Sequence, residues 1–524
     1  MKHNFKFYDV ERMESVAQIV ENSKNLYGDS PAIKYKKKKI AYEKSYNELF
    51  EDSHKFAKKL LEEYKNVKHI AILGPSSYEW VVTYLGIAAA GLVAVPLDKE
   101  LNTEKLVEQL KQADVDCLVF DECLVKTKDE ILSDINIETI SMDKILENID
   151  DAIELPKINP NELFEIVFTS GTTGESKGVM LTQANIAANV WQGLQQVNLE
   201  HDKDVVLSIL PLNHAYELTC TYLCMIFRGV PVCICSGKKY IQREIKEYAP
   251  TVMFAVPLVA NILYKKIEIS VKNLNKEKAF NFITNINSIL FHMNIDISGI
   301  FLGEVKKALG GRLRELVCGG AKLEEDLISK YNGIGITMLQ GYGLTECSPL
   351  LSVNLDYYQR ANSVGKIVEG CEVKSVDGEL WARGISVSKG YYNNESATLD
   401  GFEDGWFKTG DLGYVDKDGF IYITGRKKNL IILDNGENVS AEELESHIYK
   451  IDGVAEVLAY GENNGITAEI YLDPENKNAD CDIIYKEIEK LNKKLPNYKN
   501  IDDVIFREKP FEKTTTQKIK RNYR

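Results

Sequence analysis

The sequence predicts an α/β protein with a large amino-terminal domain of doubly wound sheets, a small β-rich subdomain and a small, mobile α+β domain at the carboxy terminus. Strand and helix patterns alternate through the first two thirds of the chain, and short strands with Gly and Asp turns follow from about Gly365. The 524 residues exceed the size of a single core, so two or more domains are expected. The predicted domains are residues 1–425, with the β-rich subdomain at about 365–425, and residues 426–524.

Short apolar runs in the first half of the chain are typical of buried strands, and helical patterns separate them. The first set is predicted at residues 69–74, 92–96 and 117–120, with a helix at 103–113. A second set is predicted at 204–209, 230–235 and 251–256. Because a helix follows each strand before the next strand begins, we expect parallel pairing within each set.

Three later segments of the chain differ from this alternation of strands and helices. Residues 264–310 are polar and helical in pattern, and they contain no catalytic-looking cluster. Residues 379–382 and 420–423 have the pattern of short strands in the β-rich subdomain. The last hundred or so residues contain their own helix and strand patterns and end in a Lys-rich segment, which favours a separate domain.

Residues 80–97 contain no charged side chain, and their length reaches the lower limit for a membrane-spanning helix. Gly91 interrupts this run, and the residues after it form a short β-type stretch that ends at Pro96. We therefore expect a buried helix followed by a buried strand, and no transmembrane segment.

Composition places the chain among soluble globular proteins, with 44% hydrophobic and 27% charged residues. The net charge of -14 argues against binding to nucleic acid but leaves room for a local ATP site. The ten cysteines form no CxxC pair, and the amino terminus lacks the apolar segment of a secretory signal. A cytoplasmic protein with reduced thiols is expected.

The most informative stretch is residues 168–178, which are rich in Gly, Ser and Thr and contain one lysine. A strand is predicted at 163–168 and a helix at 181–194, so this stretch is expected at a strand-to-helix turn, where backbone N–H groups bind phosphate. It differs from the P-loop because two residues separate Gly174 from Lys177. An ordinary turn is the alternative, but eleven residues of this composition favour a phosphate loop. Its candidate ligands are Thr169, Ser170, Gly171, Thr172, Thr173, Gly174 and Lys177.

Further motifs follow in a fixed order along the chain. They are Cys-Gly-Gly-Ala at 318–321, Gln-Gly-Tyr-Gly-Leu-Thr-Glu at 340–346, Gly-Glu-Leu at 378–380, Arg-Gly at 383–384, Gly-Tyr-Tyr at 390–392, Gly-Trp-Phe-Lys-Thr-Gly-Asp-Leu-Gly at 405–413, Gly-Arg at 425–426 and Lys518. From about residue 40 to the terminus, this series resembles the adenylate-forming superfamily of acyl-CoA synthetases, adenylation domains and luciferases. Residues 313–323, together with the helical segment from Tyr264 that precedes them, resemble long-chain fatty acyl-CoA synthetases most.

The resemblance implies that the protein activates a carboxylic acid with ATP and Mg²⁺ to give an acyl-adenylate and pyrophosphate. Thr169, Ser170, Thr172, Thr173 and Lys177 are then expected to hold the β- and γ-phosphates, and Glu346 is expected to bind Mg²⁺, with Thr169 and Glu346 counted among the catalytic residues. The remaining nucleotide contacts implied are Gly319, Gly320, Ala321, Gln340, Gly341, Tyr342, Gly343, Thr345, Asp411, Arg426 and Lys518. Tyr342 is expected to cover the adenine, and Asp411 to bind the ribose hydroxyls.

The carboxy-terminal domain is implied to provide a catalytic lysine, Lys518, next to the α-phosphate. Gln517 precedes it where many relatives have glycine, and the alternative for Lys518 is a solvated basic tail. Lys428 falls at the family's hinge position, where the backbone conformation changes as the carboxy-terminal domain moves between two poses. Asn435, Gly436 and Glu437 resemble the loop that lines the CoA path.

The acid is expected to be a fatty acid. Residues 211–217 correspond to the segment beside the acyl pocket, where His214 is a candidate catalytic residue that closes over the carboxylate, or else an ordinary packed histidine. Relatives that adenylate amino acids have an aspartate where this chain has Ala215, so a substrate amine would lack its partner. The acyl chain length, the oligomeric state and the pathway do not follow from the sequence.

The expected partners are ATP, a fatty acid and CoA as the acyl acceptor. An acyl-carrier protein is the alternative acceptor, because it presents the same thiol arm. A catalytically inactive nucleotide-binding regulator is a less favoured alternative, and a luciferase-like oxygenase shares the first half-reaction. Nucleic acid is not expected as a partner, while peripheral contact with a membrane surface remains open.

Overall fold

The computed structural model describes residues 5–147, 153–170, 176–273, 275–291, 295–321, 323–360, 362–433, 437–462, 465–474, 476, 479–513 and 519–521. The chain divides into two compact units. Unit 1 contains Met1–Glu372, Ala382–Phe407 and Asp418–Phe420, and unit 2 contains Val373–Trp381, Lys408–Lys417 and Ile421–Arg524. The mixed α/β class and the small carboxy-terminal part are those predicted from the sequence.

Unit 1 contains a six-stranded sheet. In spatial order its strands are β6 (Glu138–Ser141), β5 (Cys117–Phe120), β3 (His69–Leu73), β4 (Val93–Pro96), β7 (Leu163–Ser170) and β8 (Ser176–Thr182). All neighbours are parallel except β7 and β8. The first predicted set of strands is therefore confirmed as β3, β4 and β5.

The second sheet of unit 1 has nine strands. In order they are β15 (Lys366–Ile367), β14 (Leu350–Val353), β13 (Thr337–Gly343), β12 (Glu315–Cys318), β11 (Val252–Ala255), β9 (Val206–Ser208), β10 (Val232–Ile234), β1 (Pro31–Lys37) and β2 (Ile40–Ser45). The strands from β13 to β1 are parallel, and antiparallel strands close both edges. This confirms the second predicted set as β9, β10 and β11.

Helices cover both faces of each sheet, as a doubly wound fold requires. The helices in contact with the sheets include α2 (Tyr46–Glu63), α3 (Tyr78–Ala90), α4 (Thr103–Gln112), α6 (Gln183–Leu194) and α13 (Glu325–Gly333). Ile70 and Ile72 of β3 belong to a core with α2, α3 and α6, whereas Ala71 and Leu73 face α4. The first core also contains Val206 of β9, so it lies between the two sheets.

The uncharged run at 80–97 forms most of α3 and then β4. Every residue of α3 except Glu79 is buried, and the helix ends at Gly91 with a φ of 69°. The predicted buried helix and strand are therefore confirmed. None of the helices in the described part of the chain combines the length and apolar character needed to cross a membrane.

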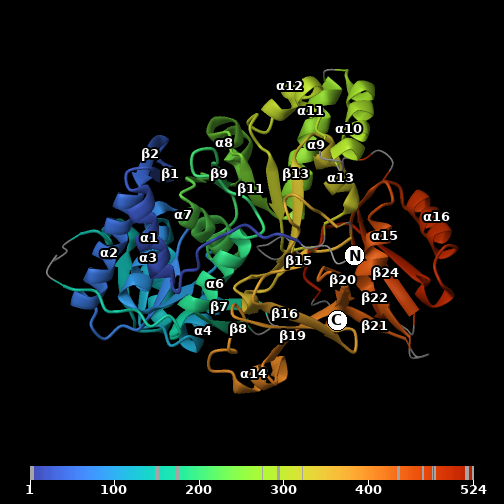
Figure 1. Ribbon diagram of the computed structural model, residues 1–524. Coiled ribbons are helices and arrows are strands. Elements are labelled where there is room, and N and C mark those ends of the chain that lie inside the picture. Colours follow the sequence, from blue (N-terminus) through green and yellow to red (C-terminus); the bar gives the residue numbers. More distant parts are fainter. Residues whose placement is uncertain are drawn as a thin grey trace. The chain divides into compact units, whose positions relative to one another are not determined.

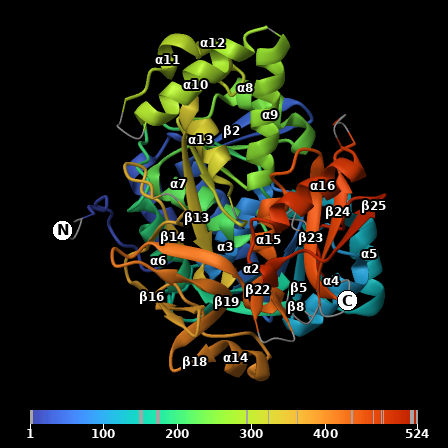
Figure 2. The same cartoon turned by 90° about the vertical axis from the view of Figure 1, so that its right-hand side faces the viewer.

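A helical insert lies between β11 and β12 and is seen at the top of Figures 1 and 2. Its helices are α9 (Pro257–Asn273), α10 (Glu277–Phe291), α11 (Ser298–Phe301) and α12 (Gly303–Lys307). The insert is helical as predicted, but its surface is more apolar than the sequence suggests, because several large hydrophobic side chains are exposed on it.

Short strands occupy the region where the sequence predicts a β-rich subdomain. They are β16 (Cys371–Val376), β17 (Glu379–Gly384), β18 (Phe402–Glu403), β19 (Trp406–Val415) and β20 (Ile421–Arg426), in one five-stranded sheet. Helix α14 (Glu395–Gly401) lies between β17 and β18 in the chain.

Unit 2 also has a core of its own. The elements around this core are β21 (Leu430–Ile432), β22 (Asn438–Ser440), α15 (Ala441–Ile448), β23 (Val454–Glu462), β24 (Gly465–Leu472), α16 (Cys481–Asn492) and β25 (Asp503–Arg507). Leu444 of α15, Ile470 of β24 and Ile484 of α16 are fully buried in it.

Candidate active site

The predicted phosphate loop lies between the two strands of a β-hairpin, so the prediction that it links a strand to a helix is wrong. β7 and β8 pair antiparallel, with Thr169 opposite Lys177. Residues 176–182 form a strand because they pair with β7, and α6 begins only after Thr182, whose hydroxyl caps it. Gly171, Thr172, Thr173 and Gly174 lie outside the described residues, as does the side chain of Ser170.

Tyr391 joins the lysine of this hairpin to the expected metal ligand. The Lys177 Nζ lies 5.2 Å from the centre of the Tyr391 ring, a cation–π contact. The Tyr391 hydroxyl donates a hydrogen bond of 2.8 Å to Oε1 of Glu346. Burial, together with the adjacent Glu346 charge, raises the pKa of Tyr391, so the hydroxyl remains a donor. Three predicted motifs are thereby brought together in unit 1.

The backbone around Tyr391 holds it in this place. The Met180 N–H donates to the Gly390 carbonyl at 3.0 Å, and the Tyr392 N–H donates to the Gly178 carbonyl at 2.8 Å. Residues 390–392 thus lie along β8 like a short extra strand. Gly390 has a φ of 139°, and a Cβ there would meet the side chain of Thr398 at 2.6 Å, so only glycine suits the position.

Glu346 lies in a short 3-10 turn, Thr345–Cys347, between β13 and β14. Only 8% of Glu346 is exposed, and its carbonyl accepts a hydrogen bond from the Ser388 N–H. The turn contacts β8 of the phosphate hairpin. A largely buried carboxylate beside a phosphate loop fits a ligand of a hard divalent cation.

The two glycine-rich motifs lie at the carboxyl ends of adjacent parallel strands, β12 and β13, where α/β sheets bind ligands. Gly319, Gly320 and Ala321 follow β12, and Gln340, Gly341, Tyr342 and Gly343 end β13. Gly320 has a φ of 81°. A Cβ on Gly343 would come within 1.9 Å of the Pro349 carbonyl oxygen, so this position requires glycine. Tyr342 is 9% exposed.

The predicted acyl segment continues into a π-helix, Tyr216–Leu223, and then α7 (Cys224–Arg228). The Tyr216 hydroxyl donates to the Val317 carbonyl at 3.0 Å, and a Cβ on Gly319 would lie 3.2 Å from the Tyr216 ring. The acyl segment therefore abuts the glycine motif after β12. His214 is partly buried at the start of this segment, and Ala215 is 6% exposed.

A buried carboxyl, Glu217, lies inside the π-helix. The Ser208 and Thr221 hydroxyls donate to it at 2.5 and 2.9 Å. Burial raises the pKa of Glu217 to about 7. Neither Glu217 nor the π-helix was expected, because the sequence pattern does not separate π from α turns. For Tyr391, the Gly-Tyr-Tyr motif was visible in the sequence but carried no assigned role.

In unit 2 the structure pairs Asp411 with Arg426. The two residues are opposite each other on β19 and β20, and the Arg426 Nε lies 2.6 Å from Oδ1 of Asp411. Lys428 follows two residues later, and partial burial together with the charges of Arg426 and Arg521 lowers its pKa. Lys518, Asn435 and Gly436 lie outside the described residues, and Glu437 is an exposed residue of the loop before β22.

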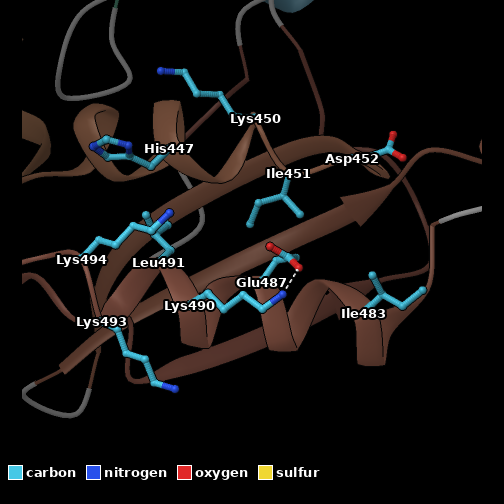
Figure 3. A pocket seen from close by; sticks show the side chains of 10 residues that line it. All are labelled: His447, Lys450, Ile451, Asp452, Ile483, Glu487, Lys490, Leu491, Lys493 and Lys494. Atoms are coloured by element: carbon cyan, nitrogen blue, oxygen red, sulfur yellow. Dashed lines mark hydrogen bonds and ion pairs between the residues drawn. The ribbon is translucent and has the colours of Figure 1, made fainter.

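Unit 2 also has a groove of about 720 Å³ between α15 and α16, shown in Figure 3. Four lysines line it, Lys450, Lys490, Lys493 and Lys494, and so does His447. Its apolar lining includes Ile451 and Leu491, and Glu487 forms an ion pair of 2.7 Å with Lys490. Of the sequence-predicted site residues that the structure describes, none lines this groove.

Residues 20–392 match the family model of AMP-binding enzymes, which is well over half of the chain, and the protein belongs to this family. A long-chain-fatty-acid–CoA ligase of Mycobacterium bovis is 30% identical over 442 residues, covering 78% of this chain and 73% of the relative. Another, from Escherichia coli O157:H7, is 26% identical over 520 residues, covering 88% and 85%. Among solved structures, the O-succinylbenzoate coenzyme A synthetase of Bacillus subtilis in complex with AMP has a TM-score of 0.78 at 24% identity, covering 96% of this chain and 97% of that one.

Proposed function

We propose that this protein is a fatty acid–CoA ligase that acts through an acyl-adenylate. A carboxylate oxygen attacks the α-phosphorus of ATP and pyrophosphate leaves; the CoA thiol then attacks the acyl carbon, and AMP leaves. Family membership and the fatty acid ligases among the relatives support this proposal. The observation that carries it is the contact of Tyr391 with both Lys177 and Glu346, because it joins a cation for phosphate to a carboxylate for a metal ion.

The residues of unit 1 fit ATP with a magnesium ion. Thr169, Ser170, Thr172, Thr173 and Lys177 would hold the β- and γ-phosphates, and Glu346 would hold Mg²⁺. Within the described residues, no group of three or more His, Cys, Asp or Glu side chains could hold a metal ion alone. Glu346 would supply one carboxylate ligand, which suits an ion that arrives with the phosphates, as Mg²⁺ does, and that would neutralise their charge.

The other assignments follow the family order of the motifs. Gly319, Gly320 and Ala321, together with Gln340, Gly341, Tyr342, Gly343 and Thr345, would enclose the adenine. In unit 2, Asp411 would bind the ribose hydroxyls and Arg426 would contact the nucleotide. Lys518 would stabilise charge on the α-phosphate. Lys428 is proposed as the hinge, and Asn435, Gly436 and Glu437 as the lining of the thiol path. His214 would close the acyl pocket over the carboxylate. We also propose that the protein is cytoplasmic.

Acid-dependent release of pyrophosphate from ATP tests this function. We expect release to require Mg²⁺ and a fatty acid, and acyl-CoA to form only when CoA is added. Pyrophosphate release without dependence on any acid, or AMP binding without turnover over the whole panel of acids, would contradict the proposal and favour the inactive regulator.

The lysine-lined groove of unit 2 favours a second candidate acceptor, an acyl-carrier protein, which would meet it with an acidic surface (Figure 3). The variant Lys493→Glu/Lys494→Glu should then lower kcat/KM for the carrier protein by on the order of tenfold while kcat/KM for CoA stays unchanged. Lys486→Glu is the control, because Lys486 is exposed on α16, the helix that ends just before Lys493, and does not line the groove. Equal rates for the groove variant and the control would remove this candidate.

A further inference from the structure

Exposed hydrophobic side chains are concentrated in the helical insert of unit 1. Nineteen large hydrophobic side chains are exposed in the described part of the chain, and seven of them belong to the insert. These seven are Leu258, Ile262, Ile269, Phe282, Ile286, Ile289 and Ile295. Scattered single hydrophobic residues are normal on a protein surface, but a concentration of this kind marks an interaction site.

Helix α9 has two apolar faces. One face, with Leu263, Ile267 and others, is buried in the core beneath the nine-stranded sheet. On the opposite face, Leu258, Ile262 and Ile269 are 37%, 44% and 58% exposed. Their spacing of four and seven residues aligns them along the outer side of the helix.

Helix α10 repeats this arrangement. Phe280 and Asn287 face inward and are buried, whereas Phe282, Ile286 and Ile289 lie on the outer side. Phe282 and Ile289 are 68% and 69% exposed. The core of the unit does not need these outer side chains, so folding alone does not account for them.

Lysines accompany the exposed apolar residues. Residues 257–311 contain seven lysines against four acidic residues, a net charge of +3 in a chain of net charge -14. Lys265, Lys266 and Lys272 flank the outer face of α9 and are exposed. None of these three forms an ion pair in the described part of the chain. The outer face of α9 is therefore apolar along its middle and cationic at its sides.

We propose that the outer faces of α9 and α10 form a docking surface for an anionic lipid bilayer. Apolar side chains flanked by lysines are what the boundary between lipid headgroups and acyl chains accommodates. A second copy of this chain fits less well, because a two-fold contact of this face would place lysines against lysines. The inference deepens the proposed function, since a bilayer is where a long-chain acid would be dissolved.

Flotation of the full-length protein with lipid vesicles tests this surface. We expect binding to vesicles of equal parts phosphatidylcholine and phosphatidylglycerol, weaker binding to pure phosphatidylcholine, and a loss of binding as salt rises. Ile262→Glu/Ile269→Glu and Phe282→Glu/Ile289→Glu should each lower the vesicle partition coefficient by on the order of tenfold or more. Leu399→Glu is the matched control, because Leu399 is 70% exposed on α14, outside the insert, and should bind like the wild type.

A charge variant keeps the test valid if an apolar variant is unstable. Lys265→Ser/Lys266→Ser should fold normally and lose most of the preference for anionic vesicles. Pyrophosphate release with a water-soluble medium-chain acid should be unchanged in every variant, so loss of docking is distinguished from loss of the proposed activity. Failure of the wild type to bind anionic vesicles, equal binding by the insert variants, or a dimer that the insert variants dissociate would each overturn the proposal.

Discussion

Tyr391 contacts Lys177 through its ring and Glu346 through its hydroxyl. A single substitution can remove the hydroxyl and keep the ring. Tyr391→Phe should keep the contact with Lys177 and lose the hydrogen bond to Glu346. A hydrogen bond to a charged group contributes about 1.5–3 kcal/mol, so kcat/KM for ATP with Mg²⁺ should fall by about ten- to a hundredfold. Pyrophosphate release over a Mg²⁺ titration measures this.

The neighbouring tyrosine is the control for that change. The Tyr392 hydroxyl donates to Asp114 at 3.0 Å, on the same segment but away from Glu346. Tyr392→Phe should therefore stay close to the wild type. If both variants lose the same activity, the segment is damaged as a whole and Tyr391 has no particular role.

Lys518 is assigned from motif order, and its chemistry can be tested one half-reaction at a time. Lys518→Ala should lower acyl-AMP formation by on the order of 10²-fold or more, as for the loss of one preorganised charge. Thioester formation from acyl-AMP supplied in the assay should stay largely intact. Lys520→Ala is the control, since Lys520 is a neighbouring exposed lysine, and near-normal pyrophosphate release by Lys518→Ala would refute the assignment.

Glu217 makes the stability of unit 1 depend on pH. Its pKa rises from 4.5 to about 7 on folding, so between these values the native state holds a proton that the unfolded chain releases. Stability contributed by the protonated carboxyl is therefore complete below pH 4.5 and is lost progressively as pH rises toward 7. Glu217→Gln cannot ionise and should gain about 3 kcal/mol relative to the wild type between pH 4 and pH 8.

Denaturant unfolding at several pH values measures this difference. Glu122→Gln is the control for the loss of a carboxylate, because Glu122 is exposed and lies outside the π-helix. A constant offset for Glu217→Gln would mean that the carboxyl ionises freely in the folded protein.

At the scale of an element, we expect the backbone of the segment after β20 to change conformation between the adenylation step and the thioester step. Lys428 lies in a short 3-10 turn, Lys427–Asn429, between β20 and β21. Lys428→Pro fixes φ and restricts Lys427, so it should spare acyl-AMP formation and block transfer to the thiol. Lys428→Ala keeps the backbone free and should perform both steps. Equal loss of both half-reactions in Lys428→Pro would indicate general damage instead.

The elements show where sequence patterns suffice and where pairing decides. The runs at 69–74 and 117–120 are apolar and short, and their strands follow from pattern alone. Residues 176–182 are also apolar in part, but only their pairing with β7 makes them a strand, and that partner is not visible in a local window. The π-helix at 216–223 was missed because the sequence pattern does not distinguish π turns from α turns.

Motif order predicted most of the candidate site but not its connections. Lys177 and Glu346 were expected to act on the same phosphates, and the structure adds Tyr391 as the residue between them. Contacts between residues more than two hundred positions apart are set by the sheet topology, which no local pattern contains. The assignments of Lys518 and Lys428 remain predictions.

At the scale of the whole molecule, the absence of a carboxylate at position 215 favours a fatty acid over an amino acid as the substrate. Ala215 is buried and has no carboxylate to pair an α-amine, so an amino acid would bury an uncompensated charge at a cost of several kcal/mol. A fatty acid instead gains about 0.8 kcal/mol per buried CH₂ until the pocket is full. Medium- or long-chain acids should exceed every standard amino acid by on the order of 10²-fold in kcat/KM, and comparable pyrophosphate exchange with amino acids would contradict this.

The order of strands in the nine-stranded sheet affects how the chain is made. β1 is translated first but pairs with β10, whose Val232 lies opposite Ile33. At about 5–20 residues per second on the ribosome, the edge of β1 that later pairs with β10 stays without its partner for on the order of ten seconds or more. Lys34, Lys36 and Lys37 lie on that strand, and charges on an open edge deter pairing with other nascent chains. Replacing these lysines with threonine would therefore make pairing between nascent chains more frequent during synthesis, before the ATP site has folded.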